Sequence, residues 1–207
     1  MDDRVVVALF RHGLTELNKQ KTYMGWTDEP ICEEAKESLT ALQPNPYQVV
    51  VTSDLIRCLQ TAAILFPEKD PIPFLEFREM NFGPFERKRY EELAGDPRYE
   101  EWISSHFESN VPGAETFTDF TQRVENGWTN LSTLVMRDKV DSLAVVTHGG
   151  VLRYLLSKFA PTEKSFWEWR VPHGNGFEFV WPNRETFRRG ERCTLLREVL
   201  LTENQHG

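Results

Sequence analysis

The segment VVVALFRHGLTELN, residues 5–18, begins with six apolar residues and changes character at the Arg-His-Gly triplet 11–13. A short apolar run rich in valine is typical of a strand buried on both faces, as the strands of parallel sheets are. We therefore predict a strand over Val5–Phe10 that ends where the triplet begins. Its position indicates that the strand delivers these polar residues to a site.

The rest of the chain alternates strand and helix patterns. Apolar runs at 48–52 and 142–147 are each followed by residues whose apolar side chains recur at helical spacing. This alternation predicts an α/β fold around a mostly parallel sheet. The predicted strands are 5–10, 48–52, 142–147, 176–181 and 194–200, and the last two pair as a hairpin across a polar turn at 182–183. The predicted helices are 54–66, 116–136 and 151–159, with one or two short helices within 90–112.

Length, charge and cysteine count limit the classes of protein. A chain of 207 residues suits one domain, so residues 1–207 are predicted to form a single domain with a small cap at roughly 84–115. The net charge of -8 disfavours nucleic acid and anionic membranes as partners. Asp2 and Asp3 lie where a signal peptide needs positive charge, so we expect a cytoplasmic protein without a membrane span. Three widely spaced cysteines favour reduced thiols.

Chemically active side chains follow the predicted strands. The first strand ends at 11–13, the second leads to Arg57 one turn into its helix, and the third ends at His148 and Gly149. Ligands of open parallel sheets bind at this edge. Arginine forks match phosphate oxygens, and neutral imidazole is a nucleophile toward phosphorus. The pattern predicts a phosphate site in which one histidine attacks and the other stabilises the transferring group.

A leaving oxygen also needs a proton, and Glu79 is the candidate donor. It lies in FREMNFGPFE, where Asn81 and Gly83 break regular structure. A bound dianion would favour the protonated form of its carboxyl group. Glu76 and Glu86 lie nearby, and an exposed carboxylate is the ordinary alternative for each of the three.

Six segments together carry a resemblance to one family. The chain resembles the histidine phosphatase superfamily, which has the phosphoglycerate mutase-like fold, and within it the short bacterial phosphatases of the α-ribazole phosphatase branch. The segments are Arg11-His12-Gly13 with Asn18, GWTDEPI from Gly25, TSDLIRCLQTA from Thr52, REMNFGPFE from Arg78, PGAET from Pro112 and VVTHGG from Val145. A lone Arg-His-Gly is weak evidence, whereas all six in this order are a strong signal.

The resemblance implies a three-layer α/β/α fold with a mixed, mostly parallel six-stranded sheet. It implies that His12 is the phosphorylated nucleophile, that Glu79 is the proton donor, and that no metal ion or other cofactor is used. The expected partner is a small phosphorylated substrate, and a homodimer is left open. The expected phosphate-binding residues are Arg11, His12, Asn18, Arg57, His148 and Gly149.

The chain departs from the family pattern in its loops. The family often has glycine after the glutamate at position 86, where this chain has Arg87. A common Leu-Thr pair is replaced by Ile31 and Cys32, and a common glycine by Ala35. These departures concern loop geometry and leave the expected chemistry unchanged.

Several residues have competing interpretations. A zinc site would also use histidines, but no pair has the spacing of helix ligands, and Arg11 would repel a cation. His173 precedes a predicted strand, and we interpret it as a solvent-facing loop residue, with a place at the rim of the site as the alternative. The aromatic residues are interpreted first as core. If one set lines the mouth of the pocket, the choice is Trp102 and Phe107 over Phe166, Trp167 and Trp169.

The sequence therefore predicts a phosphatase that hydrolyses small phosphomonoester metabolites through a phosphohistidine on His12. One alternative is phosphoryl transfer of the cofactor-dependent phosphoglycerate mutase type, although such mutases usually have a longer cap and tail. A second alternative is a non-catalytic phosphate-binding protein. An isomeric product without free phosphate would identify a mutase, and binding without cleavage would identify the binding protein.

Overall fold

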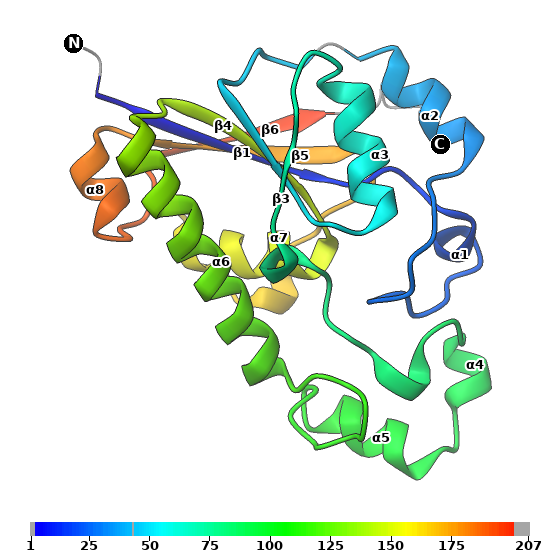
Figure 1. Cartoon of the computed structure of the whole chain (residues 1–207). Helices are drawn as coiled ribbons and strands as arrows, with labels where there is room; N and C mark the ends of the chain where they lie inside the picture. Colours follow the sequence, from blue (N-terminus) through cyan, green and yellow to red (C-terminus); the bar gives the residue numbers. More distant parts are fainter. Residues whose placement is uncertain (1–2, 43, 201–207) are drawn as a thin grey trace.

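The computed structural model describes residues 3–42 and 44–200, which form one six-stranded sheet with helices on both faces (Figure 1). The strands are β1 (Val5–Arg11), β2 (Val49–Thr52), β3 (Ile72–Pro73), β4 (Ser142–Thr147), β5 (Asn175–Trp181) and β6 (Leu195–Leu200), in the order β3-β2-β4-β1-β5-β6. The first four pair in parallel, and β5 runs antiparallel to β1 and β6. The predicted mixed, mostly parallel six-stranded sheet is confirmed, and the two C-terminal strands pair with each other as predicted.

The helices form the two outer layers of a three-layer arrangement. Helices α2 and α3 cover one face of the sheet, and α6, α7 and α8 cover the other (Figure 1). The helices are α1 (Glu16–Lys19), α2 (Glu33–Thr40), α3 (Ile56–Leu65), α4 (Tyr90–Leu93), α5 (Pro97–Ser104), α6 (Phe117–Asp138), α7 (Gly149–Phe159) and α8 (Arg184–Arg188). Three 3-10 turns are η1 (Leu75–Phe77), η2 (Gly83–Phe85) and η3 (Phe166–Glu168).

Strand β1 is buried on both faces because successive side chains of a strand point to opposite sides. Val7 and Leu9 belong to the core that includes α6 and α7, whereas Ala8 and Phe10 belong to the core that includes α2 and α3. All four side chains are fully buried. The continuous apolar run in the sequence is thus explained by two cores that share one strand.

The three long predicted helices begin or end at different residues in the structure. Helix α3, predicted at 54–66, spans Ile56–Leu65. Helix α7 begins at Gly149, two residues earlier than predicted, because His148 already has the extended backbone of an N-cap. Thr116 caps α6, since its Oγ1 accepts a hydrogen bond from the backbone N–H of Asp119. That helix continues to Asp138 and ends at Lys139, whose φ of 54° is left-handed.

The sequence analysis missed the helices α1, α2 and α8, the edge strand β3 and the three 3-10 turns. The edge strand β3 has only two residues, too short for a periodic pattern to mark it. The turn predicted at 182–183 leads into helix α8 instead. Asn183 caps this helix by accepting a hydrogen bond of 2.9 Å from the backbone N–H of Thr186, and Phe187 is buried on its inner side.

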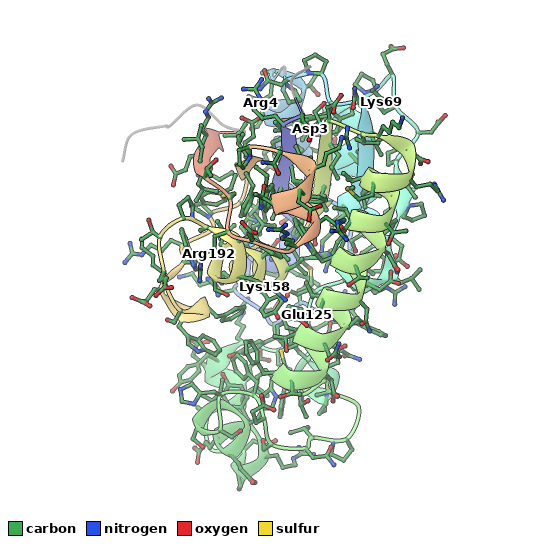
Figure 2. All side chains as sticks on the ribbon, turned by 90° about the vertical axis from the view of Figure 1, so that its left-hand side faces the viewer. Asp3, Arg4, Lys69, Glu125, Lys158 and Arg192 are labelled. Atoms are coloured by element: carbon green, nitrogen blue, oxygen red, sulfur yellow. The ribbon has the colours of Figure 1, made fainter. Side chains whose placement is uncertain are left out.

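Helices α6 and α7 are joined by polar contacts at their surface (Figure 2). Glu125 of α6 accepts hydrogen bonds from Tyr154 and Lys158 of α7. Arg192 donates a hydrogen bond of 2.7 Å to the carbonyl oxygen of Ala160, just past the end of α7.

Within the described residues, no helix has both the length and the apolar character that a membrane crossing requires.

The predicted cap contains the short helices α4 and α5 and has an aromatic centre. The Trp102 side chain is fully buried, with ring centroids 5.2 Å from Phe85, 6.0 Å from Tyr23 and 4.3 Å from Phe107. These residues belong to, or pack against, the same apolar core as α6 and α7. The cap is therefore continuous with the main core on that face of the sheet.

Trp102→Ala should lower the free energy of unfolding by about 3–5 kcal/mol, the usual cost of truncating a buried aromatic residue. Urea unfolding at unchanged m value measures this loss. Ile103→Ala is the matched control on the same helix, because Ile103 is 38% exposed, and it should cost less than about 1 kcal/mol. Equal losses in the two variants would show that the cap does not depend on its aromatic centre.

Candidate active site

The carboxyl ends of β1 and β4 and the first turn of α3 converge on one cluster of side chains. The backbone N–H of His12 donates to the carbonyl oxygen of Thr147, which continues the pairing of β1 with β4 by one residue. The ring centroids of His12 and His148 lie 5.2 Å apart. Arg57 Nε donates to His148 Nδ1 over 3.3 Å. The structure thus brings together three residues that are up to 136 positions apart, His12, Arg57 and His148.

His12 is buried and holds a defined tautomer. Its Nδ1 lies 2.7 Å from the carbonyl oxygen of Gly13, and because a carbonyl only accepts, Nδ1 carries the proton. Burial is the main cause that lowers the pKa of His12 well below 6.5, followed by the charge of Arg57 and contributions from His173 and Arg11. A neutral ring protonated at Nδ1 keeps the lone pair on Nε2, which is the form a nucleophile requires.

His148 is also neutral, with the opposite tautomer. Its Nδ1 accepts from Arg57, so Nε2 carries the proton and donates to Ser53 Oγ over 2.9 Å. Burial lowers the pKa of His148 well below 6.5, and the charge of Arg57 acts in the same direction. The sequence analysis assigned no role to Ser53, and the structure places it as the partner that fixes this ring.

Arg57 is fully buried, and its guanidinium group binds backbone as well as His148. It donates to the carbonyl oxygens of Gly25 over 2.6 Å and Thr27 over 2.8 Å. Burial lowers its pKa, but a guanidinium group still carries its charge at neutral pH. Arg57 therefore places a fixed positive charge beside both histidines.

Arg11 is the second cation of the cluster. One of its terminal nitrogens donates to the carbonyl oxygen of Val171, whereas its Nε is buried and has no hydrogen-bond partner. A Cβ at Gly149 would lie 3.2 Å from the guanidinium carbon, so glycine permits this close approach. Burial lowers the pKa of Arg11 to about 10, and the charge of Glu79 opposes the shift. A buried charged donor without an acceptor is costly, and an anion would satisfy it.

Glu79 lies at the start of helix α7. Its carboxylate accepts 2.9 Å from the backbone N–H of Gly150 and 3.0 Å from that of Met80. A Cβ built on Gly150 would lie 2.2 Å from Glu79 Oε1, so only glycine leaves room for the carboxylate there. The charge of Glu79 opposes the effect of burial on the pKa of both Arg11 and Arg57, so Glu79 lies beside the arginines of the cluster.

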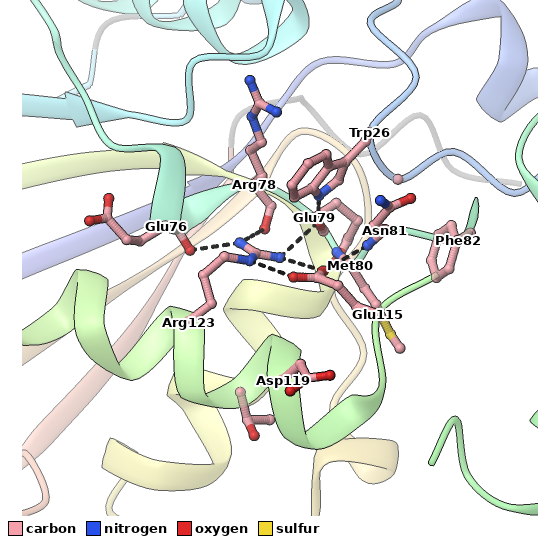
Figure 3. Close-up of polar contacts among 12 residues, drawn as sticks. Trp26, Glu76, Arg78, Glu79, Met80, Asn81, Phe82, Glu115, Asp119 and Arg123 are labelled. Carbon is pink, nitrogen blue, oxygen red and sulfur yellow. Dashed lines mark hydrogen bonds and ion pairs between the residues drawn. The ribbon is translucent and has the colours of Figure 1, made fainter. Parts of the chain in front are cut away.

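A single arginine of α6 holds the backbone that carries Glu79 (Figure 3). Arg123 donates to the carbonyl oxygens of Glu76, Arg78 and Glu79 at 2.9–3.1 Å. Its other contact is a two-pronged ion pair with Glu115, at 2.7 Å for both oxygens. The glutamate of the PGAET segment thereby orients the arginine that fixes the loop. The sequence analysis quoted that segment without assigning this role.

Glu86 has an internal role rather than that of an exposed carboxylate. Its two carboxylate oxygens accept from the backbone N–H groups of Gly25, Trp26 and Thr27 at 2.7–3.2 Å. The next residue, Arg87, has a φ of 64°, a conformation that favours glycine. Arg87, at which the chain departs from the family pattern, therefore has a strained backbone conformation and lies beside an ordered loop.

Residues 7–183 match the family described as the histidine phosphatase superfamily, branch 1. The chain belongs to this superfamily. The adenosylcobalamin/α-ribazole phosphatase of Salmonella typhimurium is 31% identical over 175 residues, which cover 80% of this chain and 85% of the relative. A 2,3-bisphosphoglycerate-dependent phosphoglycerate mutase of Cytophaga hutchinsonii is 27% identical over 172 residues, with 76% and 80% covered.

The fold agrees with solved structures of histidine phosphatases. The crystal structure of a putative α-ribazole-5'-P phosphatase from Escherichia coli superposes with a TM-score of 0.78 at 23% identity and covers 98% of both chains. This likeness confirms the phosphoglycerate mutase-like α/β fold. The named relatives include phosphatases and a mutase, both of which move phosphoryl groups.

Asn18, one of the expected phosphate-binding residues, forms side-chain hydrogen bonds with Thr15. Its Oδ1 accepts from the backbone N–H and the hydroxyl of Thr15, which caps helix α1. No hydrogen bond among the described residues links Asn18 to the two histidines or to Arg11. A phosphate contact by Asn18 remains a prediction, and it would use the amide nitrogen, which the cap leaves available.

The interpretation of His173 as a solvent-facing loop residue is wrong. Its ring centroid lies 5.3 Å from that of His12, and its Nδ1 is buried without a hydrogen-bond partner. Burial, followed by the charge of Arg11, lowers the pKa of His173 to about 3. A signal was present in the sequence, because His173 precedes a glycine as His12 and His148 do. It precedes its strand instead of following it, and because β5 is antiparallel to β1 the start of that strand lies at the edge where β1 ends.

The expected aromatic lining is only partly correct. Phe107 does line a pocket beside Glu79, but Trp102 is fully buried in the cap. The other aromatic wall is formed by Phe166 and Trp167, from the set that was not chosen. The α5 helix turns Trp102 inward, and the left-handed residue that follows it, Phe107, faces the pocket.

The histidines are not grouped with carboxylates in the manner of a metal site. Among the described residues, one group of three metal-ligating side chains comes within reach of a common point, namely Glu16, Cys32 and Glu34. Lys19 forms ion pairs of 2.9 Å with both glutamates, so it already offsets part of their negative charge. The expectation of metal-free chemistry stays a prediction.

Acidification should destabilise the protein between about pH 7 and pH 5. The folded pKa values of His12, His148 and His173 lie below the unfolded value near 6.5, so below that pH the unfolded chain binds protons that the folded chain excludes. Each histidine contributes a slope of up to about 1.4 kcal/mol per pH unit. Denaturant unfolding at pH 7, 6 and 5 measures the slope.

His173→Asn should reduce this slope, whereas His106→Asn, a change on the exposed surface of the cap, should leave it unchanged. The explanation fails if stability is constant over this pH range or if the two variants have the same effect.

Proposed function

We propose that this protein is a phosphatase that hydrolyses small phosphomonoesters through a phosphohistidine on His12. The observation that carries the proposal is the buried, unpartnered Nε of Arg11 beside neutral His12 and the buried cation Arg57. These groups together require an anion with several acceptor oxygens, and a phosphate group has them. A nucleophile and a proton donor lie next to the same place.

In the first step, Nε2 of His12 attacks phosphorus and the bond from phosphorus to the ester oxygen breaks. The Nδ1–H bond to Gly13 keeps the ring in the reactive tautomer and stabilises the positive charge that develops on it. Protonated Glu79 gives its proton to the leaving oxygen, so the alcohol departs neutral. Arg11 and Arg57 balance the charge of the transferring group.

In the second step, water attacks the phosphohistidine. Glu79, now a carboxylate, takes a proton from the water, and the bond between phosphorus and Nε2 breaks. The products are inorganic phosphate and neutral His12. His148 lies 5.2 Å from His12 and its Nδ1 accepts from Arg57, so in this proposal it stabilises the transferring group by positioning that arginine.

The named relatives support hydrolysis and leave one rival. The Salmonella phosphatase is the more similar of the two relatives described, at 31% against 27% for the mutase. The mutase reaction is therefore the second candidate, and it would yield an isomer in place of free phosphate.

The partner in this proposal is a small phosphorylated molecule. We place the enzyme in the cytoplasm, in keeping with its three free cysteines, and homodimerisation stays a prediction.

Phosphate release from a panel of phosphorylated metabolites and 4-nitrophenyl phosphate, in EDTA, tests the proposal. The native protein should release phosphate, and His12→Ala should lose at least about 1,000-fold in kcat because it lacks the nucleophile. Acid-quenched native enzyme should carry phosphate on His12, detected by mass spectrometry. Isomer formation without free phosphate would favour the mutase, and activity in His12→Ala would refute the assignment of the nucleophile.

Gly150→Ala should reduce kcat by on the order of 100-fold for alkyl phosphates, because the added Cβ displaces the carboxylate of Glu79. The loss should be smaller for 4-nitrophenyl phosphate, whose leaving group needs little protonation. Helix stability should not suffer, since alanine is the better helix former.

The control is the double variant Gly150→Ala with Glu79→Gln. If both changes act on the same proton transfer, the double variant should be no slower than Glu79→Gln alone. Additive losses would mean that Gly150 matters for another reason.

A further inference from the structure

A pocket beside Glu79 has aromatic walls and one cationic side chain. It has a volume of about 180 Å³. Its aromatic lining comes from Phe107 of the cap, Phe120 of α6, and Phe166 and Trp167 of the η3 turn, together with Tyr23 and Phe82. A dry protein cavity of about 150 Å³ holds one benzene molecule. The pocket therefore fits one ring with a small substituent.

The walls are held in place by the cap core. Phe107 contacts Trp102 at 4.3 Å and Trp167 at 5.3 Å between ring centroids. The backbone N–H of Phe117 donates to the carbonyl oxygen of Phe107, which ties this wall to the start of α6. Trp167 is 47% exposed, so the pocket opens to solvent on that side. Rings held in this way form a preformed surface for a planar group.

Arg153 of α7 is the cationic side chain of this pocket. Within the described part of the chain it forms no hydrogen bond or ion pair, and its Nε is buried without an acceptor. It is also close enough to Arg11 for its charge to lower the pKa of that residue. Two neighbouring guanidinium groups repel each other unless anions bind between or beside them. No step of the proposed mechanism uses Arg153.

We propose that this pocket is the leaving-group subsite and that it selects phosphate monoesters whose leaving group combines a planar ring with an anionic or acceptor oxygen group. The ring packs against Phe107 and Trp167, which line the pocket together, and the oxygen group accepts hydrogen bonds from Arg153. Glu79 lines the same pocket and is the proposed proton donor to the ester oxygen, so the subsite continues directly from the reacting atoms. The inference rests on the proposed function only where it predicts hydrolysis of these esters. The predicted binding preference does not depend on hydrolysis.

The test compares four phosphate esters: 4-carboxyphenyl phosphate, its methyl ester, phenyl phosphate and glycerol 2-phosphate. For Arg153→Met, kcat/KM should fall about tenfold more for the carboxylate than for the methyl ester, because the variant loses a charge-assisted hydrogen bond. Comparing each substrate between native and variant protein cancels differences in intrinsic reactivity. Arg153→Lys should restore part of the loss.

Two further variants test the aromatic contact of the substrate ring separately from Arg153 and control for the general loss of a positive charge. Trp167→Ala should lower kcat/KM for the three aryl esters by about three- to tenfold and leave glycerol 2-phosphate unchanged. Arg137→Met removes an exposed arginine that pairs with Asp138, far from the pocket in sequence, and should change none of the four. An equal loss on all four esters in Arg153→Met would overturn the proposal, because Arg153 would then serve the phosphate group. No loss in Arg153→Met would overturn it as well.

Binding without turnover keeps the two proposals distinguishable. In calorimetric titrations of His12→Ala, 4-carboxyphenyl phosphate should bind more tightly than phenyl phosphate, and adding Arg153→Met should remove the difference. If this pattern holds while the native protein hydrolyses nothing, the subsite stands and the phosphatase proposal fails. If hydrolysis is seen but neither assay distinguishes the carboxylate, the subsite proposal fails and the phosphatase proposal stands.

Discussion

The buried guanidinium group of Arg57 is the contact on which the site depends. It binds His148 and the carbonyl oxygens of Gly25 and Thr27, while Glu86 binds N–H groups of the same loop. The loop is therefore held between a cation on its carbonyl side and an anion on its amide side. Breaking either contact would leave buried charge uncompensated, which costs more than an exposed ion pair contributes. The loop, the helix α3 and the second histidine are thus ordered as one unit.

Local patterns predicted much of this arrangement. The strand ending at His12 and the helix carrying Arg57 follow from periodicity and from the rule that parallel strands present their carboxyl ends together. The roles of Ser53, His173 and Arg153 do not, because each depends on which side chains from distant segments pack against it. The choice of Trp102 as a pocket residue failed for the same reason. Helical spacing shows that an aromatic residue is on one face of α5, and only packing decides which side is enclosed.

Charge is distributed unevenly between the site and the rest of the molecule. The whole chain has a formal charge of -8, whereas the site gathers Arg11, Arg57 and Arg153 around histidines whose pKa values are lowered. A phosphorylated ligand therefore gains little from the long-range field and depends on donors within hydrogen-bond distance. Neutral histidines suit such a site, since positive charges beyond those of the three arginines would raise the cost of keeping it folded without a ligand.

Because β1 is buried on both faces, the number of residues in the strand is also constrained. Alternate apolar residues of β1 point into one core or the other. His12 follows directly after the last residue of the strand. An insertion or deletion of a single residue would exchange Val7 and Leu9 for Ala8 and Phe10 between cores of different shape. The same change would turn the histidine to the opposite side of the sheet. The length of the strand is therefore constrained as tightly as the identity of the residue that follows it.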